Sequence, residues 1–382
     1  MKFLFIAVGS EASVFAVAPL ATSVRNAGHE VLLAVNEQQS GAAEAIGVPV
    51  VTFKTESIGD FIRAGRPKNA RKGSRDPRKS MQGVGRGFGR MASAGLDALL
   101  DLAKKWPPDV VVGGSMTYVA GLLATHLNVP YVRQSSDIVP TTDHDIGAEE
   151  ELRPELKRLG LDGLPVPALF LDVCPPSLKS SYALDAQPMR WISGNRQRRL
   201  EPWMYTRPEG RRRVLITSGT RSLMLNTSGG SMRYLVDQLA MAGAEVLIAA
   251  PGEAADEFGT DLSDVHIGWI PLDVVAPTCD LAVNHGGGAT VMTILSAGVP
   301  QLIIPESVRA QAIAQTLSSV GATMEPQQQG VDPKSAEAIA AGSREILSKP
   351  QYARQARALA NEVATLPTPS EVVRTLTTLA PV

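Results

Sequence analysis

Short apolar runs alternate with segments of helical periodicity along the first half of the chain. The run from Phe3 to Val8 has the length of a buried strand, and Val17 to Asn26 carries a helical spacing that ends near Gly28. Strand-like segments follow at 30–35, 48–53, 109–112 and 131–133, with a helix-like segment at 118–127. Strands separated by helices predict right-handed βαβ units and a parallel sheet.

The pattern begins again at Arg213, where Val214 to Thr217 form another apolar run. A helix-like segment at 230–242 and strand-like segments at 245–249, 265–269 and 301–304 continue it. The sequence therefore predicts an α/β protein with two Rossmann-like, doubly wound domains that bind ligands at the C-terminal ends of their strands. We expect the domains at 1–195 and 213–350, joined by a polar, arginine-rich linker at 196–212.

One segment, from Arg63 to Arg90, departs from the pattern. It holds ten basic residues, one acid and six glycines, and we interpret it as a long, solvated, irregular insertion. Its glycines do not form a dinucleotide fingerprint, because Phe88 occupies the third glycine position. The segment also lacks the interleaved aromatic residues typical of nucleic-acid binding, so we expect no nucleic-acid partner.

Composition narrows the class of protein. A chain of 382 residues is long enough for two domains, and a net charge of −1 gives no general attraction to nucleic acid. Cys174 and Cys279 show no metal-ligand spacing, so both are expected to be buried thiols. The first apolar run is too short for an export signal, and no run approaches 18 residues. These features predict a cytoplasmic protein without a membrane partner.

The stretch His285-Gly286-Gly287-Gly288 points to a ligand. It lies between a strand-like run and a helix-like segment that begins with Ala289-Thr290. Glycines at such a turn let backbone N–H groups approach phosphate oxygens, and the helix N-terminus adds partial positive charge. His285 would add a side-chain donor. The alternative is a tight strand–helix turn without a ligand.

The residues around this turn resemble the donor-binding signature of GT-B glycosyltransferases that act on antibiotics. The matching stretches are Gly268 to Leu272, Cys279-Asp280, His285 to Gly288 and Ser296 to Gln301, with further agreement at 1–35 and 213–221. The resemblance implies two domains facing across a cleft, with the last helices, 351–382, packed back on the first domain. It also implies a nucleotide-sugar donor and no metal or cofactor. The donor-binding residues would be Ser218, Gly219, Thr220, Trp269, Ile270, Leu272, His285, Gly286, Gly287, Gly288, Ala289 and Thr290.

The residue that serves as catalytic base in many members of this family is not found at the corresponding position of this chain. Many relatives carry a histidine where this sequence has Ser13, and a serine without a paired base does not take up a proton at neutral pH. Asp137 is a better candidate, because it follows the strand at 131–133, where chemistry concentrates in parallel sheets. Ser10 and Ser13 remain further candidates. The alternative for Asp137 is a helix N-cap.

The number of hydroxyl groups on the sugar can be inferred from two polar residues that this chain lacks. Hydroxyl-rich sugars are held in the family by an Asp-Gln pair, and those positions are Arg309 and Ala310 here. An unpaired buried hydroxyl costs on the order of 1–3 kcal/mol, so the sequence favours a deoxysugar such as a 2,6-dideoxyhexose. Leu272, where plant enzymes carry a glutamine, resembles the bacterial branch of the family, which implies a thymidine diphosphate donor. The residues expected near the sugar and the acceptor are Arg309, Ala310, Phe53, Met81, Phe88 and Met116.

Three further stretches narrow the resemblance to the landomycin and urdamycin olivosyltransferases, which act on angucycline polyketides. These are Gly9-Ser10, the context of Asp137, and 200–205. This implies an inverting transfer of D-olivose to a phenolic oxygen of an aromatic polyketide. The alternatives are a C-glycosidic bond to the adjacent ring carbon, a non-catalytic protein that only binds the nucleotide sugar, and an epimerase of the nucleotide sugar. A monomer and a homodimer are both compatible with the sequence.

Overall fold

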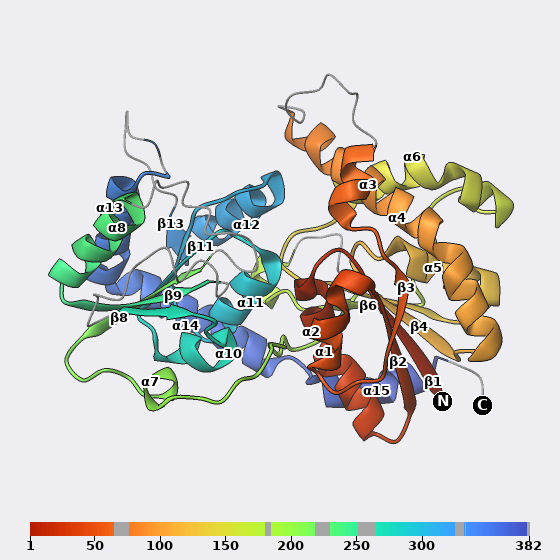
Figure 1. Cartoon of the computed structure of the whole chain (residues 1–382), viewed down its shortest axis with the longest axis horizontal. Coiled ribbons are helices and arrows are strands. Elements are labelled where there is room, and N and C mark those ends of the chain that lie inside the picture. The colour runs from red at the N-terminus through yellow and green to blue at the C-terminus, as the bar shows by residue number, and fades with distance from the viewer. Residues whose placement is uncertain are drawn as a thin grey trace. The chain divides into compact units, whose positions relative to one another are not determined.

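The chain folds into two compact α/β units. The computed structural model describes residues 1–64, 76–179, 185–217, 230–250, 265–324, 332 and 334–379 (Figure 1). Unit 1 comprises Met1–Cys174, Lys179–Arg196 and Leu366–Val382, and unit 2 comprises Pro175–Leu178 and Gln197–Thr365. The chain therefore crosses from one unit to the other near residue 196 and returns near residue 366.

Unit 1 is built on a seven-stranded sheet with the order β3-β2-β1-β4-β5-β6-β7. All of its strand pairs are parallel. The strands are β1 (Lys2–Ala7), β2 (Glu30–Asn36), β3 (Val50–Lys54), β4 (Val110–Gly114), β5 (Tyr131–Gln134), β6 (Leu169–Asp172) and β7 (Gln187–Pro188). The central strand β1 is buried almost throughout, which agrees with the apolar run at its position in the sequence.

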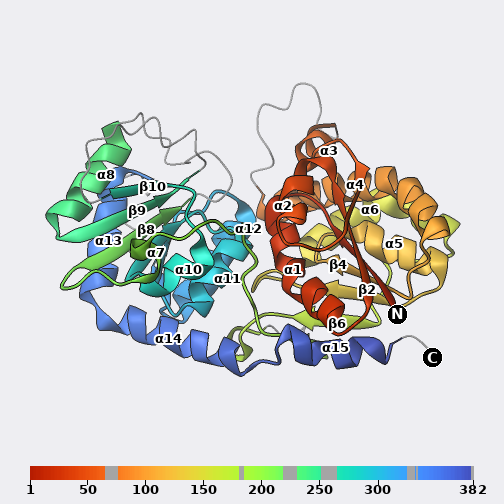
Figure 2. The same cartoon turned by 60° about the horizontal axis from the view of Figure 1, so that its bottom comes forward.

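Helices cover both faces of this sheet (Figure 2). One hydrophobic core joins β1 and β4 to the apolar faces of α4, α5 and α6. The first helix, α1, packs against the last one, α15. The helices are α1 (Glu11–Asn26), η1 (Glu37–Gln39), α2 (Ser40–Glu44), α3 (Ile58–Ala64), α4 (Pro77–Lys105), α5 (Tyr118–Leu127), α6 (Thr142–Arg158) and α15 (Pro369–Thr377).

Unit 2 repeats the design with six parallel strands in the order β10-β9-β8-β11-β12-β13. One face is covered by α8 and α13, and the other by α7, α10 and α11. The strands are β8 (Arg212–Thr217), β9 (Ala244–Ala249), β10 (Val265–Gly268), β11 (Leu281–Asn284), β12 (Gln301–Ile303) and β13 (Thr323–Met324). The helices are η2 (Pro176–Leu178), α7 (Pro202–Tyr205), α8 (Gly230–Met241), α10 (Leu272–Val275), η5 (Ala276–Thr278), α11 (Gly288–Ser296), α12 (Val308–Ser319), α13 (Ala336–Ser348) and α14 (Pro350–Thr365).

The interpretation of 63–90 as an irregular insertion is wrong for most of its length. Residues 77–90 form the first half of the long helix α4, and residues 65–75 lie outside the described part of the chain. The glycines are the reason that the sequence is misleading. A Cβ added at Gly85 would collide with the carbonyl oxygen of His144 on α6, and one at Gly147 would collide with that of Gln82. The glycines therefore allow two helix backbones to approach closely, which local helix propensity does not reveal.

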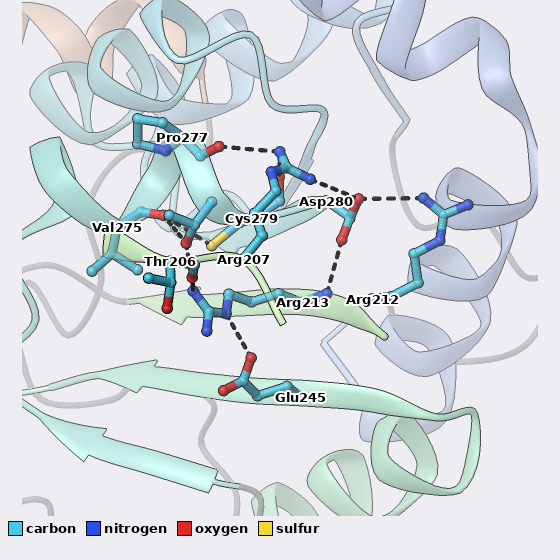
Figure 3. Close-up of polar contacts among 10 residues, drawn as sticks. Thr206, Arg207, Arg212, Arg213, Glu245, Val275, Pro277, Cys279 and Asp280 are labelled. Atoms are coloured by element: carbon cyan, nitrogen blue, oxygen red, sulfur yellow. Dashed lines mark hydrogen bonds and ion pairs between the residues drawn. The ribbon is translucent and has the colours of Figure 1, made fainter. Parts of the chain in front are cut away.

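The arginine-rich segment expected to be a linker is anchored on unit 2 (Figure 3). The guanidinium group of Arg213, only 1% exposed, donates to Glu245 at 2.6 Å, to the Thr206 carbonyl at 2.7 Å and to the Thr278 hydroxyl at 2.6 Å. The Asp280 carboxylate accepts from the backbone N–H of Arg213 at 2.9 Å. These bonds hold the segment before β8 against the start of β11.

The C-terminal helices divide between the units. We expected 351–382 to pack on the first domain, but α14 belongs to unit 2 and only the part from Leu366 onward belongs to unit 1. Within unit 1, Arg190 donates its backbone N–H to the Pro367 carbonyl at 2.7 Å and its Nε to the Leu366 carbonyl at 3.1 Å. The sheet edge at 187–190 is thus joined to the C-terminal segment.

Candidate functional site

The glycine turn of unit 2 lies where the strand order of its sheet reverses. β11 ends at Asn284, which is paired with Thr217 at the end of β8. β9 and β10 lie beyond β8, whereas β12 and β13 lie beyond β11. His285, Gly286 and Gly287 follow β11 directly and lead into α11, with Gly287 as the N-cap residue. In doubly wound sheets this reversal point is where ligands bind.

Both turn glycines are needed for close packing. Gly286 has a φ of +79°, and a Cβ there would lie 2.7 Å from the Cβ of Ala310. A Cβ on Gly287 would collide with the imidazole of His285, which therefore lies against the backbone of the turn. The first N–H groups of α11, from Gly288 to Thr290, have no acceptors within the helix. Together with the imidazole they form a group of donors suited to an anion.

Two buried amides hold this turn. Asn284 was not identified from the sequence, and Gln301 was named only as the last residue of the matching stretch 296–301. The Asn284 Oδ1 accepts from the Gly286 backbone N–H at 2.9 Å, and the Asn284 Nδ2 donates to the Gln301 Oε1 at 2.9 Å. The Gln301 Nε2 donates to the carbonyl of Val291 on α11 at 3.2 Å. The available signal was a polar residue at the end of an apolar strand run, at Asn284, and another at the start of one, at Gln301.

The residues expected beside the nucleotide base follow β10. Trp269 is half-buried, and its carbonyl accepts from Arg198 at 3.1 Å. Ile270 is 4% exposed and belongs to the apolar core. A nucleotide-sugar donor would therefore contact its backbone rather than its side chain. Leu272 opens α10, and Ala289 and Thr290 lie in the first turn of α11. Ser218, Gly219 and Thr220 lie outside the described residues.

The start of α12 is next to the glycine turn. The Ser307 side chain caps this helix by accepting from the backbone N–H of Ala310 at 3.1 Å. Ala310 is buried and would touch a Cβ at Gly286, whereas Arg309 is partly exposed. The position where the resemblance implies a glutamine therefore borders the glycine turn, and here it offers only a methyl group.

In unit 1 the loop after β1 leads into α1. Gly9 has a φ of +100°, and the ring of Phe88 from α4 packs on it, 2.9 Å from where a Cβ would stand. Ser10 is the exposed N-cap residue of α1. The Ser13 hydroxyl donates to the Ser10 carbonyl at 2.6 Å, so this hydroxyl has a partner within the first helical turn. That contact favours a structural role for Ser13.

Asp137 is buried in the loop after β5, at 5% exposure. Its Oδ1 accepts from the backbone N–H of Val139 at 2.8 Å, which is the geometry of an Asx turn. The following helix, α6, begins at Thr142 with Thr141 at its N-cap position. Asp137 is therefore not the N-cap of that helix, contrary to the alternative that we considered from the sequence.

A second carboxylate, Asp172 at the end of β6, was not identified from the sequence. It is 3% exposed, and its Oδ1 accepts from the Ser135 hydroxyl and from the Cys174 backbone N–H, each at 3.1 Å. Burial raises the pKa of Asp172 above its usual range, and the nearby charge of Asp137 acts in the same direction. Asp172 and Ser135 thus support the loop that carries Asp137. An acid ending an apolar strand run was the available signal.

The apolar residues expected near the acceptor differ in their surroundings. Phe53 on β3 packs its ring against Gly95 of α4, and Met116 lies in the turn after β4. Both are partly buried beside the core that α4 shares with the sheet. Met81 is a partly buried residue near the start of α4. Phe88 is the one that the structure brings to the loop carrying Ser10.

The remaining sequence expectations concern thiols, metals and membranes. Cys174 and Cys279 are both free and buried, as predicted, and burial raises the pKa of Cys279 to about 12. Within the described ranges, histidine, cysteine and acidic side chains do not gather in threes as a metal site would require. In the same part of the chain, we find no helix with the length and apolar character needed to cross a membrane.

Solved structures define the class of protein to which this fold belongs. The glycosyltransferase SsfS6 of Streptomyces sp. SF2575, complexed with thymidine diphosphate, is 30% identical, with a TM-score of 0.85 and 99% of each chain covered. Spinosyn rhamnosyltransferase SpnG, complexed with spinosyn aglycone, is 26% identical, with a TM-score of 0.85, covering 99% of this chain and 100% of that one. The chain has the GT-B fold of glycosyltransferases.

The sequence comparison gives the family. The N-terminal domain of the erythromycin biosynthesis protein CIII-like family matches residues 22–219, and its C-terminal domain matches 233–379. L-demethylnoviosyl transferase of Streptomyces niveus is 30% identical over 388 residues, which cover 98% of this chain and 97% of the relative. The chain belongs to the erythromycin biosynthesis protein CIII-like family of antibiotic-biosynthesis glycosyltransferases.

Proposed function

We propose that this chain is an inverting glycosyltransferase that moves a deoxysugar from thymidine diphosphate to a phenolic hydroxyl of an aromatic polyketide. We further propose D-olivose as the sugar and an angucycline as the acceptor. The observation that carries the proposal is the glycine turn at the strand-order reversal of unit 2, with His285 folded against it. The complex of SsfS6 with thymidine diphosphate supports this choice of nucleotide.

In the proposed reaction the acceptor oxygen forms a bond to the anomeric carbon as the bond to the diphosphate oxygen breaks. Asp137 takes the phenolic proton, so the attacking oxygen carries more negative charge in the transition state. The bonding electrons of the broken bond leave with thymidine diphosphate. His285 and the first N–H groups of α11 stabilise the charge that develops there. Attack opposite to the leaving group inverts the anomeric configuration.

The choice of a deoxysugar is supported by the start of α12. Ala310 presents a methyl group beside the turn, and Arg309 cannot accept a hydrogen bond from a sugar hydroxyl. A fully hydroxylated hexose would lose hydrogen-bond partners at these positions, at a cost on the order of 1–3 kcal/mol for each unpaired hydroxyl. We therefore expect kcat/KM to be higher for 2,6-dideoxyhexose donors than for glucose donors.

Turnover with defined substrates tests the proposal. Purified protein is incubated with thymidine diphosphate-olivose and a phenolic angucycline, and the products are separated and identified by mass spectrometry and NMR. An acid-labile O-glycoside with release of thymidine diphosphate is expected. A C-glycoside would correct the linkage only. Nucleotide-sugar binding without release of thymidine diphosphate would establish a non-catalytic protein, and a new sugar still attached to the nucleotide would establish an epimerase.

A further inference from the structure

Gln301 opens β12 and Asn284 closes β11, and their side-chain amides meet between the two strands. Both residues are almost fully buried, at 3% and 2% exposure. Most buried amides in proteins have their donors and acceptors paired. Here three hydrogen bonds follow one another. The Gly286 N–H donates to Asn284, Asn284 donates to Gln301, and Gln301 donates to the Val291 carbonyl. The chain of hydrogen bonds therefore links the first turn of α11 to the glycine turn before it.

This chain of bonds determines the shape of the turn. The Gly286 N–H donates to the Asn284 Oδ1, and Gly286 itself has a φ of +79°. Ala310 and Ile303 close the space on the other side, so the turn has little freedom to relax. Neither amide needs to touch the donor to influence it. Their effect is to set the direction of the backbone between the end of β11 and the start of α11.

We propose that Asn284 and Gln301 are positioning residues for the donor diphosphate, which they orient by holding the Gly286 turn against the start of α11. The proposal rests on the function proposed above, in which this turn binds thymidine diphosphate. It also gives a physical role to the glutamine of the Gly298-Val299-Pro300-Gln301 stretch. That role is to align the N–H donors of the neighbouring helix and leave the sugar to other residues.

The test measures thymidine diphosphate binding by isothermal titration calorimetry, together with KM for donor and acceptor. Gln301→Leu replaces the amide by an apolar side chain of similar volume and removes its hydrogen bonds to Asn284 and to the Val291 carbonyl. Asn284→Leu removes the acceptor for the Gly286 N–H. We expect each to raise the dissociation constant of thymidine diphosphate roughly 10-fold. The donor KM should rise in parallel, while the acceptor KM stays unchanged.

Two further variants separate positioning from general stability. Asn284→Ser keeps a side-chain oxygen that can accept from the Gly286 N–H, more weakly than the amide does, and it should bind thymidine diphosphate more tightly than Asn284→Leu. Thr323→Val is the matched control, because the buried Thr323 hydroxyl donates to the backbone carbonyl of Gln301 at 2.5 Å, on the opposite side from the turn. It should lower the melting temperature as the amide variants do, but leave thymidine diphosphate affinity unchanged.

The outcomes distinguish this inference from the proposed function. If the parent protein and His285→Ala bind thymidine diphosphate equally, the donor site itself is misplaced. If His285→Ala weakens binding but Gln301→Leu and Asn284→Leu bind like the parent, the positioning role is wrong and the donor site stands. Equal loss of affinity in Thr323→Val would also overturn the inference, because destabilisation alone would then explain the effect. If Gln301→Leu does not fold, the comparison of Asn284→Ser with Asn284→Leu decides, and equal affinity in these two variants would overturn the inference.

Discussion

Asp137 and His285 illustrate what single residues contribute to the proposed reaction. Asp137 is buried in the loop that follows the parallel strand β5 of unit 1, and one of its oxygens accepts a backbone hydrogen bond. That bond fixes the side-chain orientation, while the second oxygen is the one we assign to the phenolic proton. His285 lies against Gly287 at the start of α11. In the proposed reaction, Asp137 accepts a proton and His285 stabilises an anion.

Replacing Asp137 by asparagine removes the proposed base and keeps the shape of the side chain. The Asx turn to Val139 survives, because an amide oxygen can also accept that bond. We expect donor affinity to be unchanged and transfer to an ordinary phenol to fall by roughly 10²–10⁴-fold. Steady-state kinetics with donor and acceptor measure the transfer rate, and calorimetry measures donor affinity. Near-normal turnover by the variant would assign Asp137 to the turn alone.

Replacing His285 by alanine removes a donor to the leaving diphosphate. We expect weaker binding of thymidine diphosphate and a fall in kcat of roughly 10²-fold, the usual effect of losing one donor to a developing anion. His126→Ala is the control, since His126 is an exposed residue of α5 in unit 1. Steady-state kinetics and calorimetry measure both effects. Unchanged kinetics and affinity in His285→Ala would exclude the residue from the site.

At the scale of elements, the crossing of α4 and α6 shapes the wall of unit 1. Glycines on both helices let the backbones meet, and two arginine–glutamate pairs and one serine–glutamate hydrogen bond also join the helices. These contacts join Arg86 to Glu150, Arg90 to Glu151 and Ser93 to Glu155. The side chain of Phe88, on the same helix α4, packs on Gly9. A displaced α4 would therefore also disturb the loop that carries Ser10.

Two glycine substitutions on α4 test this packing. In Gly85→Ala the new methyl group would collide with the carbonyl oxygen of His144, and overpacking of this kind costs about 1–3 kcal/mol of unfolding free energy. Gly83→Ala is the matched control, since its methyl group would meet no atom within 4 Å. It should stabilise the helix by roughly 0.5–1 kcal/mol. Denaturant unfolding of both variants measures the difference, and equal stability would contradict the close crossing.

At the scale of the whole molecule, unit 1 is formed by segments that come before and after most of unit 2 in the sequence. Residues from Leu366 onward belong to unit 1, although the 169 residues before them, Gln197–Thr365, belong to unit 2. The returning helix α15 begins with a capping box formed by Thr368 and Glu371. It buries Val372, Val373 and Leu376. The stability of the first unit therefore depends on a segment that follows unit 2 in the sequence.

A core substitution in α15 tests this dependence. Leu376 is fully buried, and Leu376→Ala should cost unit 1 about 2–5 kcal/mol. Arg374→Ala on the exposed side of the same helix should change stability by less than about 0.5 kcal/mol. Hydrogen exchange followed by mass spectrometry reads the units separately. Faster exchange in β1 and β2, with β8 and β9 unchanged, is expected, and loss of protection in unit 2 instead would contradict the assignment of α15.

The local pattern of the sequence was sufficient for the elements whose signal is local. Apolar runs such as Phe3 to Val8 predict buried strands, because every side chain of a central parallel strand faces a covered surface. The glycine turn at 285–288 was readable because a positive φ and a close approach both require glycine. Asp137 could be identified as a candidate because it follows the strand-like run at 131–133. The sequence alone therefore places it after the C-terminal end of a parallel strand.

Tertiary structure decided the features that depend on residues far apart in the chain. α4 reads as an irregular, basic segment until α6 supplies the surface that its glycines fit. Asn284 and Gln301 are ordinary polar residues until β11 and β12 pair and bury both amides. Asp172 joins the loop of Asp137 only because β5 and β6 are neighbours in the sheet. The physical reason is the same in each case, since desolvation and close packing act on contacts that local sequence patterns do not contain.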